Sequence, residues 1–247
     1  MHPSITVHSG AAAMSLAAAR RVAAYSRLHP GRLLCLAVGD TPLAALRLLA
    51  GMEERGEAGL RAMVYVGLDE WVGLGPGDRG SCRRVMDENF YVPAGIPAGR
   101  RRVFDGLAAD PAAECKSVAA WMAGHGGIGL AVLGVGQNGH VGFNEPGGPP
   151  GEAGDCRVVD LDETTRRVSA KYFGAPRPVL RGMTVGLAAL RASDNVVILA
   201  SGSAKADIIG RAFGRPPSPE VPASLFQNHP SLEIHLDRES AAGLDAG

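Results

Sequence analysis

Short apolar runs alternate along the chain with longer helical stretches, and this alternation most constrains the fold. Several of the runs are apolar at consecutive positions, which is typical of parallel strands buried on both faces. The predicted strands are Leu33–Val38, Met63–Leu68, Gly129–Val135, Arg157–Leu161, Met183–Leu187, Val196–Ala200 and Leu232–Leu236. The predicted helices are Ala11–Leu28, Pro42–Glu57, Cys82–Phe90, Pro111–Gly124 and Ala204–Phe213.

Strands that alternate with helices in this way predict an α/β fold. We expect three layers, with a mostly parallel Rossmann-like sheet and helices on both of its faces. A length of 247 residues suits one large α/β domain, and neither a composition shift nor an internal repeat marks a boundary. The sequence therefore predicts a single domain over residues 1–247.

The charge balance disfavours several classes of partner. Lys plus Arg and Asp plus Glu each number 25, so a zero net charge favours neither nucleic acid nor an anionic membrane. The apolar runs are too short to span a bilayer, and Ala11–Ala24 carries Arg20 and Arg21 inside it, unlike a signal peptide. The four cysteines are scattered, as in a reducing compartment. We therefore expect a cytoplasmic protein.

The turn Gly39-Asp40-Thr41-Pro42 follows the predicted strand Leu33–Val38 directly. Ligands of open α/β sheets bind beyond the carboxyl ends of the strands, so this turn is a candidate site. Thr41 is a suitable N-cap and Pro42 a suitable first helical residue, and a helix start offers free N–H groups to an anion. An ordinary helix cap is the alternative interpretation.

A second such turn, Ser201–Lys205, follows the strand Val196–Ala200. Ser203 can cap the next helix, and Lys205 falls in its first turn, where a lysine opposes the helix dipole. A bound anion would explain that lysine, although a solvated surface lysine is the alternative. Lys171 is uninformative by itself.

The segment Gly134–Gly139 matches the dinucleotide pattern G-x-G-x-x-G. That pattern requires a helix to begin at the glycines. Here the chain continues through His140–Pro146 into Gly147–Pro150, where a helix cannot form. We therefore reject a nicotinamide or flavin site.

The same loop carries acid–base residues. His140 can exchange a proton near neutral pH, and Glu145, five residues on, can orient its ring. Asn138 can hold a partner by hydrogen bonding but cannot take a proton. The alternative is a structural or surface histidine.

Two adjacent carboxylates, Asp69 and Glu70, close the predicted strand Met63–Leu68. Carboxylates at the end of an apolar strand are costly unless they are solvated or used. If the strand continues they point to opposite sides, so only one faces a pocket. A solvated strand end is the alternative. The histidines outside this region lack the spacing of metal ligands, so no metal is expected.

These motifs together resemble the glucosamine-6-phosphate deaminase family. The resemblance runs from about Leu33 to His235, and the stretch Gly134–Pro146 is its most specific part. The related 6-phosphogluconolactonases follow the Gly-His pair with a Ser-Leu-Phe-Pro-like stretch, where this chain has Phe143-Asn-Glu-Pro146. The matching segments, in order, are Gly39–Pro42, Leu68–Trp71, Gly134–Pro146, Gly202–Lys205 and Pro222–His229.

The resemblance implies a cofactor-free reaction of an amino-sugar 6-phosphate with water, which gives fructose 6-phosphate or its epimer and ammonia. It implies that His140, assisted by Glu145 and Asn138, opens the sugar ring. It implies that Asp69 moves a proton between C2 and C1 of the open chain.

The resemblance also implies which residues bind the substrate. Lys171, Lys205 and the amides of Gly39, Asp40 and Thr41 would hold the phosphate. Gly136 and Glu70 complete the predicted set, with structural support as the alternative role of Glu70.

Three positions depart from the family pattern. Asn138 stands where many members have Asp, and Asp40 stands where Gly or Ser is usual. Lys171 replaces an arginine, which keeps the charge and loses the bidentate geometry.

Several alternatives remain open. Asp69–Trp71 and Gly80–Cys82 look more like the branch that acts on galactosamine 6-phosphate, the C4 epimer. A lactonase is less favoured. A sugar-phosphate sensor module is also less favoured, because sensing does not need Asp69, His140 and Glu145 together. A phosphorylated amino sugar is the expected partner, and the oligomeric state is open, a homo-oligomer included.

Overall fold

The computed structural model describes residues 3–148, 155–174 and 178–244. Its strands are β1 Ser4–His8, β2 Leu33–Leu36, β3 Val64–Gly67, β4 Asp69–Trp71, β5 Arg101–Arg102, β6 Ile128–Gly134, β7 Cys156–Asp160, β8 Arg181–Val185, β9 Asn195–Ala200 and β10 Leu232–Asp237. Its α-helices are α1 Ala11–Leu28, α2 Asp40–Glu54, α3 Cys82–Met86, α4 Pro111–Gly124, α5 Glu163–Ser169, α6 Leu187–Arg191, α7 Ala206–Phe213 and α8 Arg238–Ala241. Shorter helical turns are η1 Leu60–Ala62, η2 Asp87–Tyr91, η3 Ala98–Arg100, η4 Ala170–Tyr172, η5 Ser203–Lys205 and η6 Pro222–Phe226.

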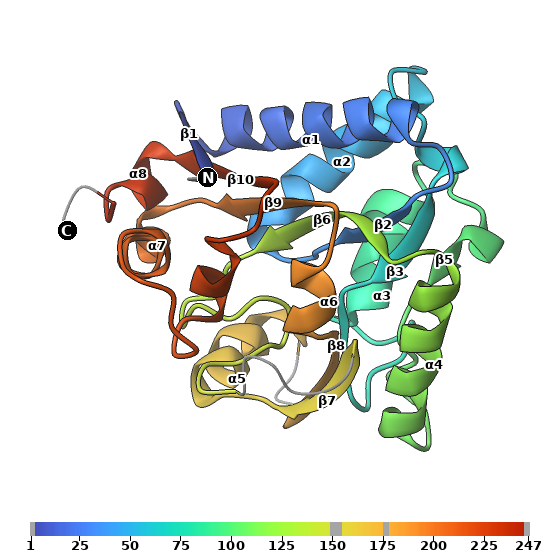
Figure 1. Ribbon diagram of the computed structural model, residues 1–247. Helices are drawn as coiled ribbons and strands as arrows, with labels where there is room; N and C mark the ends of the chain where they lie inside the picture. The colour runs from blue at the N-terminus through green and yellow to red at the C-terminus, as the bar shows by residue number, and fades with distance from the viewer. Residues whose placement is uncertain (1–2, 149–154, 175–177, 245–247) are drawn as a thin grey trace.

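The central sheet has the order β1-β10-β9-β6-β2-β3-β5, and each of its strand pairs is parallel (Figure 1). Successive side chains of β2 face opposite sides, as the pleat requires. Leu33 and Cys35 enter one apolar cluster, and Leu34 and Leu36 enter the other. The predicted mostly parallel α/β fold is confirmed.

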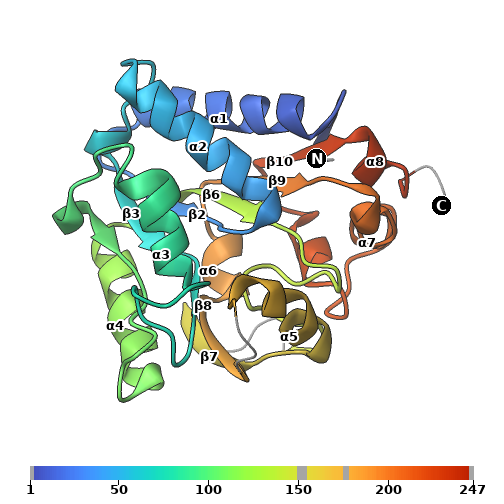
Figure 2. The same cartoon turned by 180° about the vertical axis from the view of Figure 1, so that it is seen from behind.

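Helices cover both faces of this sheet (Figures 1 and 2). The helices α1 and α2 supply one apolar cluster, and α4, α6 and α7 supply the other. The predicted helix Pro111–Gly124 has the bounds of α4, because the Asp110 side chain accepts hydrogen bonds from the N–H groups of Ala112 and Ala113. Within the described ranges, no helix combines the length and the apolar character needed to cross a membrane.

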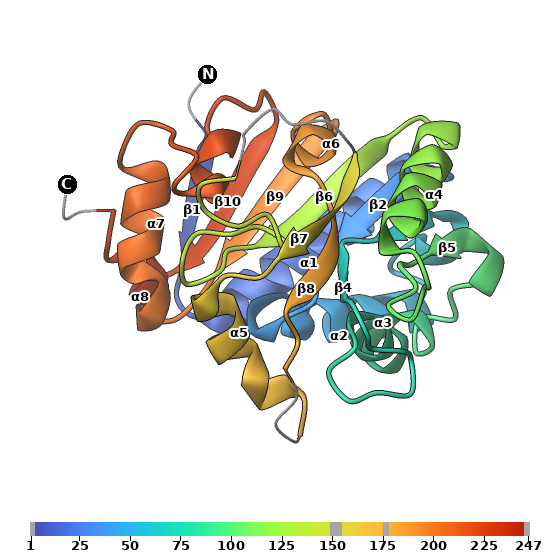
Figure 3. The same ribbon diagram turned by 90° about the horizontal axis from the view of Figure 1, so that it is seen from below.

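A second, antiparallel sheet of order β4-β8-β7 packs beside the first (Figure 3). The sequence predicted strands near β7 and β8 within a mostly parallel architecture, and the structure places both in this separate antiparallel sheet. Three residues of β7 are only partly buried, in contrast to the fully buried β2 and β3. The strands β1, β4 and β5 and the helices α5, α6 and α8 were not predicted, since each is short or exposed.

Two helix starts also differ from the prediction. The helix α2 begins at Asp40, with Gly39 at the N-cap in a left-handed conformation (φ 136°), so Thr41 is not the cap. The Thr41 hydroxyl instead lies 3.3 Å from the Ser201 hydroxyl. Ser203 opens the 3₁₀ turn η5, and α7 starts only after Lys205, because that tighter turn comes first.

The strand β9 lies inside the central sheet, which makes its side chains sensitive to truncation. Ile198 is 0% exposed and belongs to the cluster beneath α4 and α7. We expect Ile198→Ala to lower the free energy of unfolding by about 2–5 kcal/mol in urea denaturation, through lost transfer energy and a cavity. The matched truncation Leu28→Ala, at a side chain 74% exposed, should cost less than about 0.5 kcal/mol. Equal losses would contradict this description of the core.

Candidate active site

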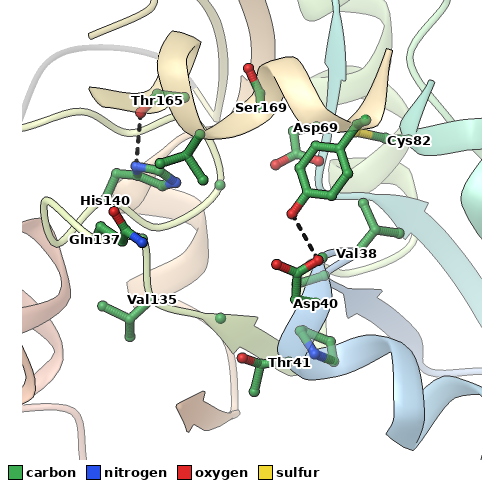
Figure 4. A pocket seen from close by; sticks show the side chains of 18 of the residues that line it. Val38, Asp40, Thr41, Asp69, Cys82, Val135, Gln137, His140, Thr165 and Ser169 are labelled. Atoms are coloured by element: carbon green, nitrogen blue, oxygen red, sulfur yellow. Dashed lines mark hydrogen bonds between the residues drawn. The ribbon is translucent and has the colours of Figure 1, made fainter. Parts of the chain in front are cut away.

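A cavity of about 450 Å³ opens where β2, β6 and β9 end and where β3 passes into β4 (Figure 4). It collects most of the residues that the sequence singled out. The predicted residues that line it are Gly39, Asp40, Thr41, Asp69, Gly136, His140, Lys171 and Lys205. The others, Asn138, Glu145 and Glu70, lie behind this lining and act on it through hydrogen bonds.

Asp69 is the first residue of β4 and faces the cavity across from His140 (Figure 4). Burial raises the pKa of Asp69 to about 7, and the charge of Glu70 adds to that rise. A hydrogen bond with the Cys82 thiol acts in the opposite direction on this pKa. Asp69 therefore exchanges its proton near neutral pH, which suits a general base.

Glu70, which the sequence offered either as a substrate-binding residue or as structural support, is not among the residues that line the cavity. Its carboxylate accepts hydrogen bonds from the N–H groups of Trp71 (2.9 Å), Cys82 (3.0 Å) and Arg83 (2.9 Å) and from the Ser81 hydroxyl (2.7 Å). Adjacent residues of a strand point to opposite faces, so Glu70 holds the start of α3 while Asp69 faces the cavity. The alternative role of structural support is the one that the contacts favour.

His140 is held from one side by Asn138. The Asn138 amide nitrogen donates to Glu145 (3.0 Å) and to Asp162 (3.3 Å), so its oxygen faces His140. That oxygen lies 2.7 Å from His140 Nδ1 and therefore accepts the Nδ1 proton. Nε2 remains the nitrogen with a free lone pair. Burial, together with the charge of Lys205, lowers the pKa of His140 to about 4, so the ring is neutral at pH 7.

The helix α5, which the sequence did not predict, and its N-cap residue contribute one contact to His140 and one to Asn138. Thr165 Oγ1 lies 3.1 Å from His140 Nδ1 (Figure 4). Asp162 caps α5 and accepts from Asn138. The Asp-x-Thr order at 162–164 is a helix-capping signal that could have located α5, but its distance from His140 could not be read from the sequence.

Gly136 lines the cavity directly against the histidine. A Cβ atom at this position would overlap the His140 ring, so a residue without a side chain is required. Its N–H donates to the His140 carbonyl (2.9 Å), which closes the loop. No helix begins within residues 135–148, so the rejection of a dinucleotide loop is consistent with the structure.

Lys205 supplies a partly buried positive charge to the cavity. Its Nζ donates to the Val135 carbonyl (2.6 Å), and burial lowers its pKa to about 8. It is therefore mostly protonated at pH 7. The hydroxyl pair of Thr41 and Ser201 joins the two turns that the sequence predicted as anion sites.

Lys171 already has an anionic partner. Its Nζ lies 2.5 Å from Asp40 Oδ2, and the Tyr172 hydroxyl donates to Asp40 Oδ1 (3.1 Å). These contacts join η4 to the first residue of α2, across 131 positions of the chain.

Aromatic side chains form one wall of the site, and the predicted site residues did not include them. The Trp71 ring lies 4.4 Å from Phe143 and 5.3 Å from Phe173, measured between centroids. Its Nε1 donates to the Gly80 carbonyl (3.0 Å), which fixes the ring beside Asp69. Among the described residues, no group of three or more His, Cys, Asp or Glu side chains could hold a metal ion.

Comparisons with known proteins give consistent relatives. The family model described as glucosamine-6-phosphate isomerases/6-phosphogluconolactonase matches residues 7–234. A glucosamine-6-phosphate deaminase of Lachnoclostridium phytofermentans is 36% identical over 90% of this chain and 93% of its own length. One of Halothermothrix orenii is 36% identical over 93% of this chain and 95% of its own length. The solved structure of a monomeric glucosamine-6-phosphate deaminase superposes with a TM-score of 0.92 at 29% identity, covering 97% of this chain and 99% of that one.

The contacts of Glu70 lead to a stability prediction. Glu70→Gln keeps the shape but replaces one accepting oxygen with a donor group, which leaves buried N–H groups unpaired. We expect a loss of about 1–3 kcal/mol in the free energy of unfolding, measured by urea denaturation. The matched change Glu88→Gln, at a side chain 56% exposed, should cost less than about 1 kcal/mol. A neutral Glu70→Gln would exclude this anchoring role.

Proposed function

The chain belongs to the family of glucosamine-6-phosphate isomerases and 6-phosphogluconolactonases, and we propose that it deaminates glucosamine 6-phosphate to fructose 6-phosphate and ammonia. The relatives named above carry that activity in their names and align over nearly the whole chain. The observation that carries the proposal is Asp69, a carboxylate with a pKa near 7 that faces a neutral His140 across one cavity.

The phosphate binds at the start of α2 in this proposal. The N–H groups of Gly39–Thr41 and the positive end of the helix dipole attract an anion, and Lys205 lines the same cavity. Lys171 approaches the same place from η4. Anchoring this end of the sugar holds its reacting carbons in place, and good orientation can lower a barrier by up to ~7–11 kcal/mol.

His140 opens the pyranose ring. Its neutral form, protonated at Nδ1 by the contact with Asn138, offers Nε2 as a base for the proton of the C1 hydroxyl. The C1–O5 bond then breaks and O5 takes a proton, which gives the open-chain aldehyde. Glu145 and Asp162 fix the direction of the Asn138 amide, and Glu145 Oε2 also lies 3.5 Å from His140 Nδ1.

Asp69 performs the carbon-acid step. Its carboxylate removes the proton from C2, beside the C1 aldehyde, and a proton is added at C1. The enolamine formed on the way becomes an imine at C2. Water adds to the imine carbon, and ammonia leaves as the ketone of fructose 6-phosphate forms. No electrons are exchanged with an external acceptor, so these residues can carry the sequence of steps without a cofactor.

The remaining expectations from the sequence are part of the same proposal. We propose that residues 1–247 act as one domain, because the cavity takes Asp69 from the small sheet and His140 and Lys205 from loops of the large one. The side chains used in these steps all line or support one cavity of the chain. The four free, buried cysteines are compatible with work in the cytoplasm.

Ammonia release from glucosamine 6-phosphate tests the function. We expect turnover by the intact chain, and a loss of about 10²–10⁴-fold in Asp69→Asn, because the amide cannot accept the C2 proton. Asp160→Asn, at an exposed position of β7, should stay within about twofold of the unmodified chain. Near-normal turnover by Asp69→Asn would remove it as the base.

The ammonia assay, together with an assay of acid release, decides between the substrates left open by the sequence. Faster ammonia release from galactosamine 6-phosphate would favour the epimer, and acid release from 6-phosphogluconolactone without ammonia would favour a lactonase.

The pKa shifts predict a bell-shaped profile of kcat/KM against pH. Asp69 must be ionised, so kcat/KM should rise as pH increases through about 7. Lys205 must be protonated to hold the phosphate, so kcat/KM should fall as pH increases beyond about 8. The matched change Lys205→Arg keeps the charge at high pH and should move the alkaline limb upward while the acid limb stays. An alkaline limb that does not move would assign it to another group.

A further inference from the structure

Asp40 places a carboxylate at the helix start where the proposed phosphate binds. It is the first residue of α2, and it lines the cavity with Lys171 and Lys205. One Asp40 oxygen lies 2.5 Å from Lys171 Nζ. The other accepts a hydrogen bond from the Tyr172 hydroxyl (3.1 Å), and the dashed line that ends at Asp40 in Figure 4 marks this bond. The Asp40 carboxylate therefore already pairs with Lys171, a residue expected to hold the phosphate of the substrate.

Both cations of the cavity respond to this carboxylate. Lys171 is paired with Asp40 directly, which raises the Lys171 pKa. Lys205 donates to a neutral carbonyl, that of Val135, and the charge of Asp40 still acts on it across the cavity. A phosphate group that enters the cavity meets Lys205, whose Nζ donates to a neutral carbonyl, and Lys171, whose charge Asp40 already neutralises. It also meets the negative charge of Asp40 itself.

The Asp40 contacts are weak enough to exchange. The Lys171 side chain is 52% exposed and that of Asp40 is 65% exposed, so water screens the pair. A phosphate dianion carries more charge than a carboxylate and can also reach the helix N–H groups, so it competes well for Lys171.

We propose that Asp40 is an internal competitor for the substrate's phosphate and thereby sets the affinity of the site. Its side chain holds Lys171 and Tyr172 against the start of α2 until a phosphate takes over Lys171. This inference rests on the proposed function in one respect, namely that a phosphate binds here. The residues that exchange partners belong to η4, which directly follows the helix α5 that carries Thr165 to His140. Release of η4 thus occurs beside the acid–base residues.

Binding of inorganic phosphate to the full chain, measured by isothermal titration calorimetry, tests the inference without catalysis. We expect Asp40→Asn to lower the phosphate Kd by roughly three- to tenfold, because the like charge is removed and Lys171 is freed. The KM for glucosamine 6-phosphate should fall in the same direction. A side chain that merely supported the turn would instead raise both values when changed.

Matched variants isolate the role of the Lys171 contact. Asp207→Asn removes the same charge at an exposed residue of α7, and should change the phosphate Kd by less than about twofold. Tyr172→Phe loosens Asp40 without changing the charge, and should lower the Kd by a smaller factor than Asp40→Asn does. In a Lys171→Ala background, Asp40→Asn should give a smaller gain, because only the removal of the like charge still contributes.

Three results of the variant comparisons would overturn the inference. They are a phosphate Kd that is unchanged or higher in Asp40→Asn, an equal gain in Asp207→Asn, and a gain that persists in full without Lys171. Failure to bind phosphate in both the intact chain and Asp40→Asn would also overturn it. The ammonia assay of the intact chain separates these results from failure of the proposed function, because calorimetry needs no turnover.

Discussion

Parallel hydrogen bonding in the central sheet is the constraint on which the site depends. In a parallel sheet all strands end at the same edge, so β2, β6 and β9 deliver their following loops to one place. The residue Leu68 is all that separates β3 from β4, where the chain passes into the small antiparallel sheet. Asp69 therefore lies at the junction of the two sheets, facing the loops that follow β2 and β6.

Burial at that junction sets the protonation states that the proposed chemistry requires. Removal from water disfavours a charged group, so it raises the pKa of Asp69 to about 7 and lowers those of His140 to about 4 and Lys205 to about 8. Near neutral pH these values give a neutral imidazole, a protonated lysine and a carboxylate close to half ionised. Burial thus shifts Asp69 and His140 into the range that the proposed acid–base steps need, while Lys205 stays mostly protonated at pH 7 despite its lowered pKa.

Local sequence pattern predicted five strands of the parallel sheet, namely β2, β3, β6, β9 and β10, because consecutive apolar residues and strand-to-helix turns are short-range signals. Local sequence pattern failed where the strand with which a segment pairs decides which sheet it joins. The strands β7 and β8 were predicted, but their assignment to an antiparallel sheet depends on pairing with β4, a strand of three residues. The contact of Thr165 with His140 spans 25 positions, and that of Lys171 with Asp40 spans 131. No periodicity encodes such distances.

The sequence by itself determined the fold class, the turns at the strand ends and the residue types available for acid–base chemistry, because these follow from polarity and spacing along the chain. Only the tertiary structure decided how those residues divide their work. The pleat of β4 directs Asp69 into the cavity and Glu70 into a cluster of backbone N–H groups. The approach of η4 to α2 pairs Lys171 with Asp40. The physical reason is that burial, pKa and pairing are properties of neighbours in space, and folding brings those neighbours together from distant parts of the chain.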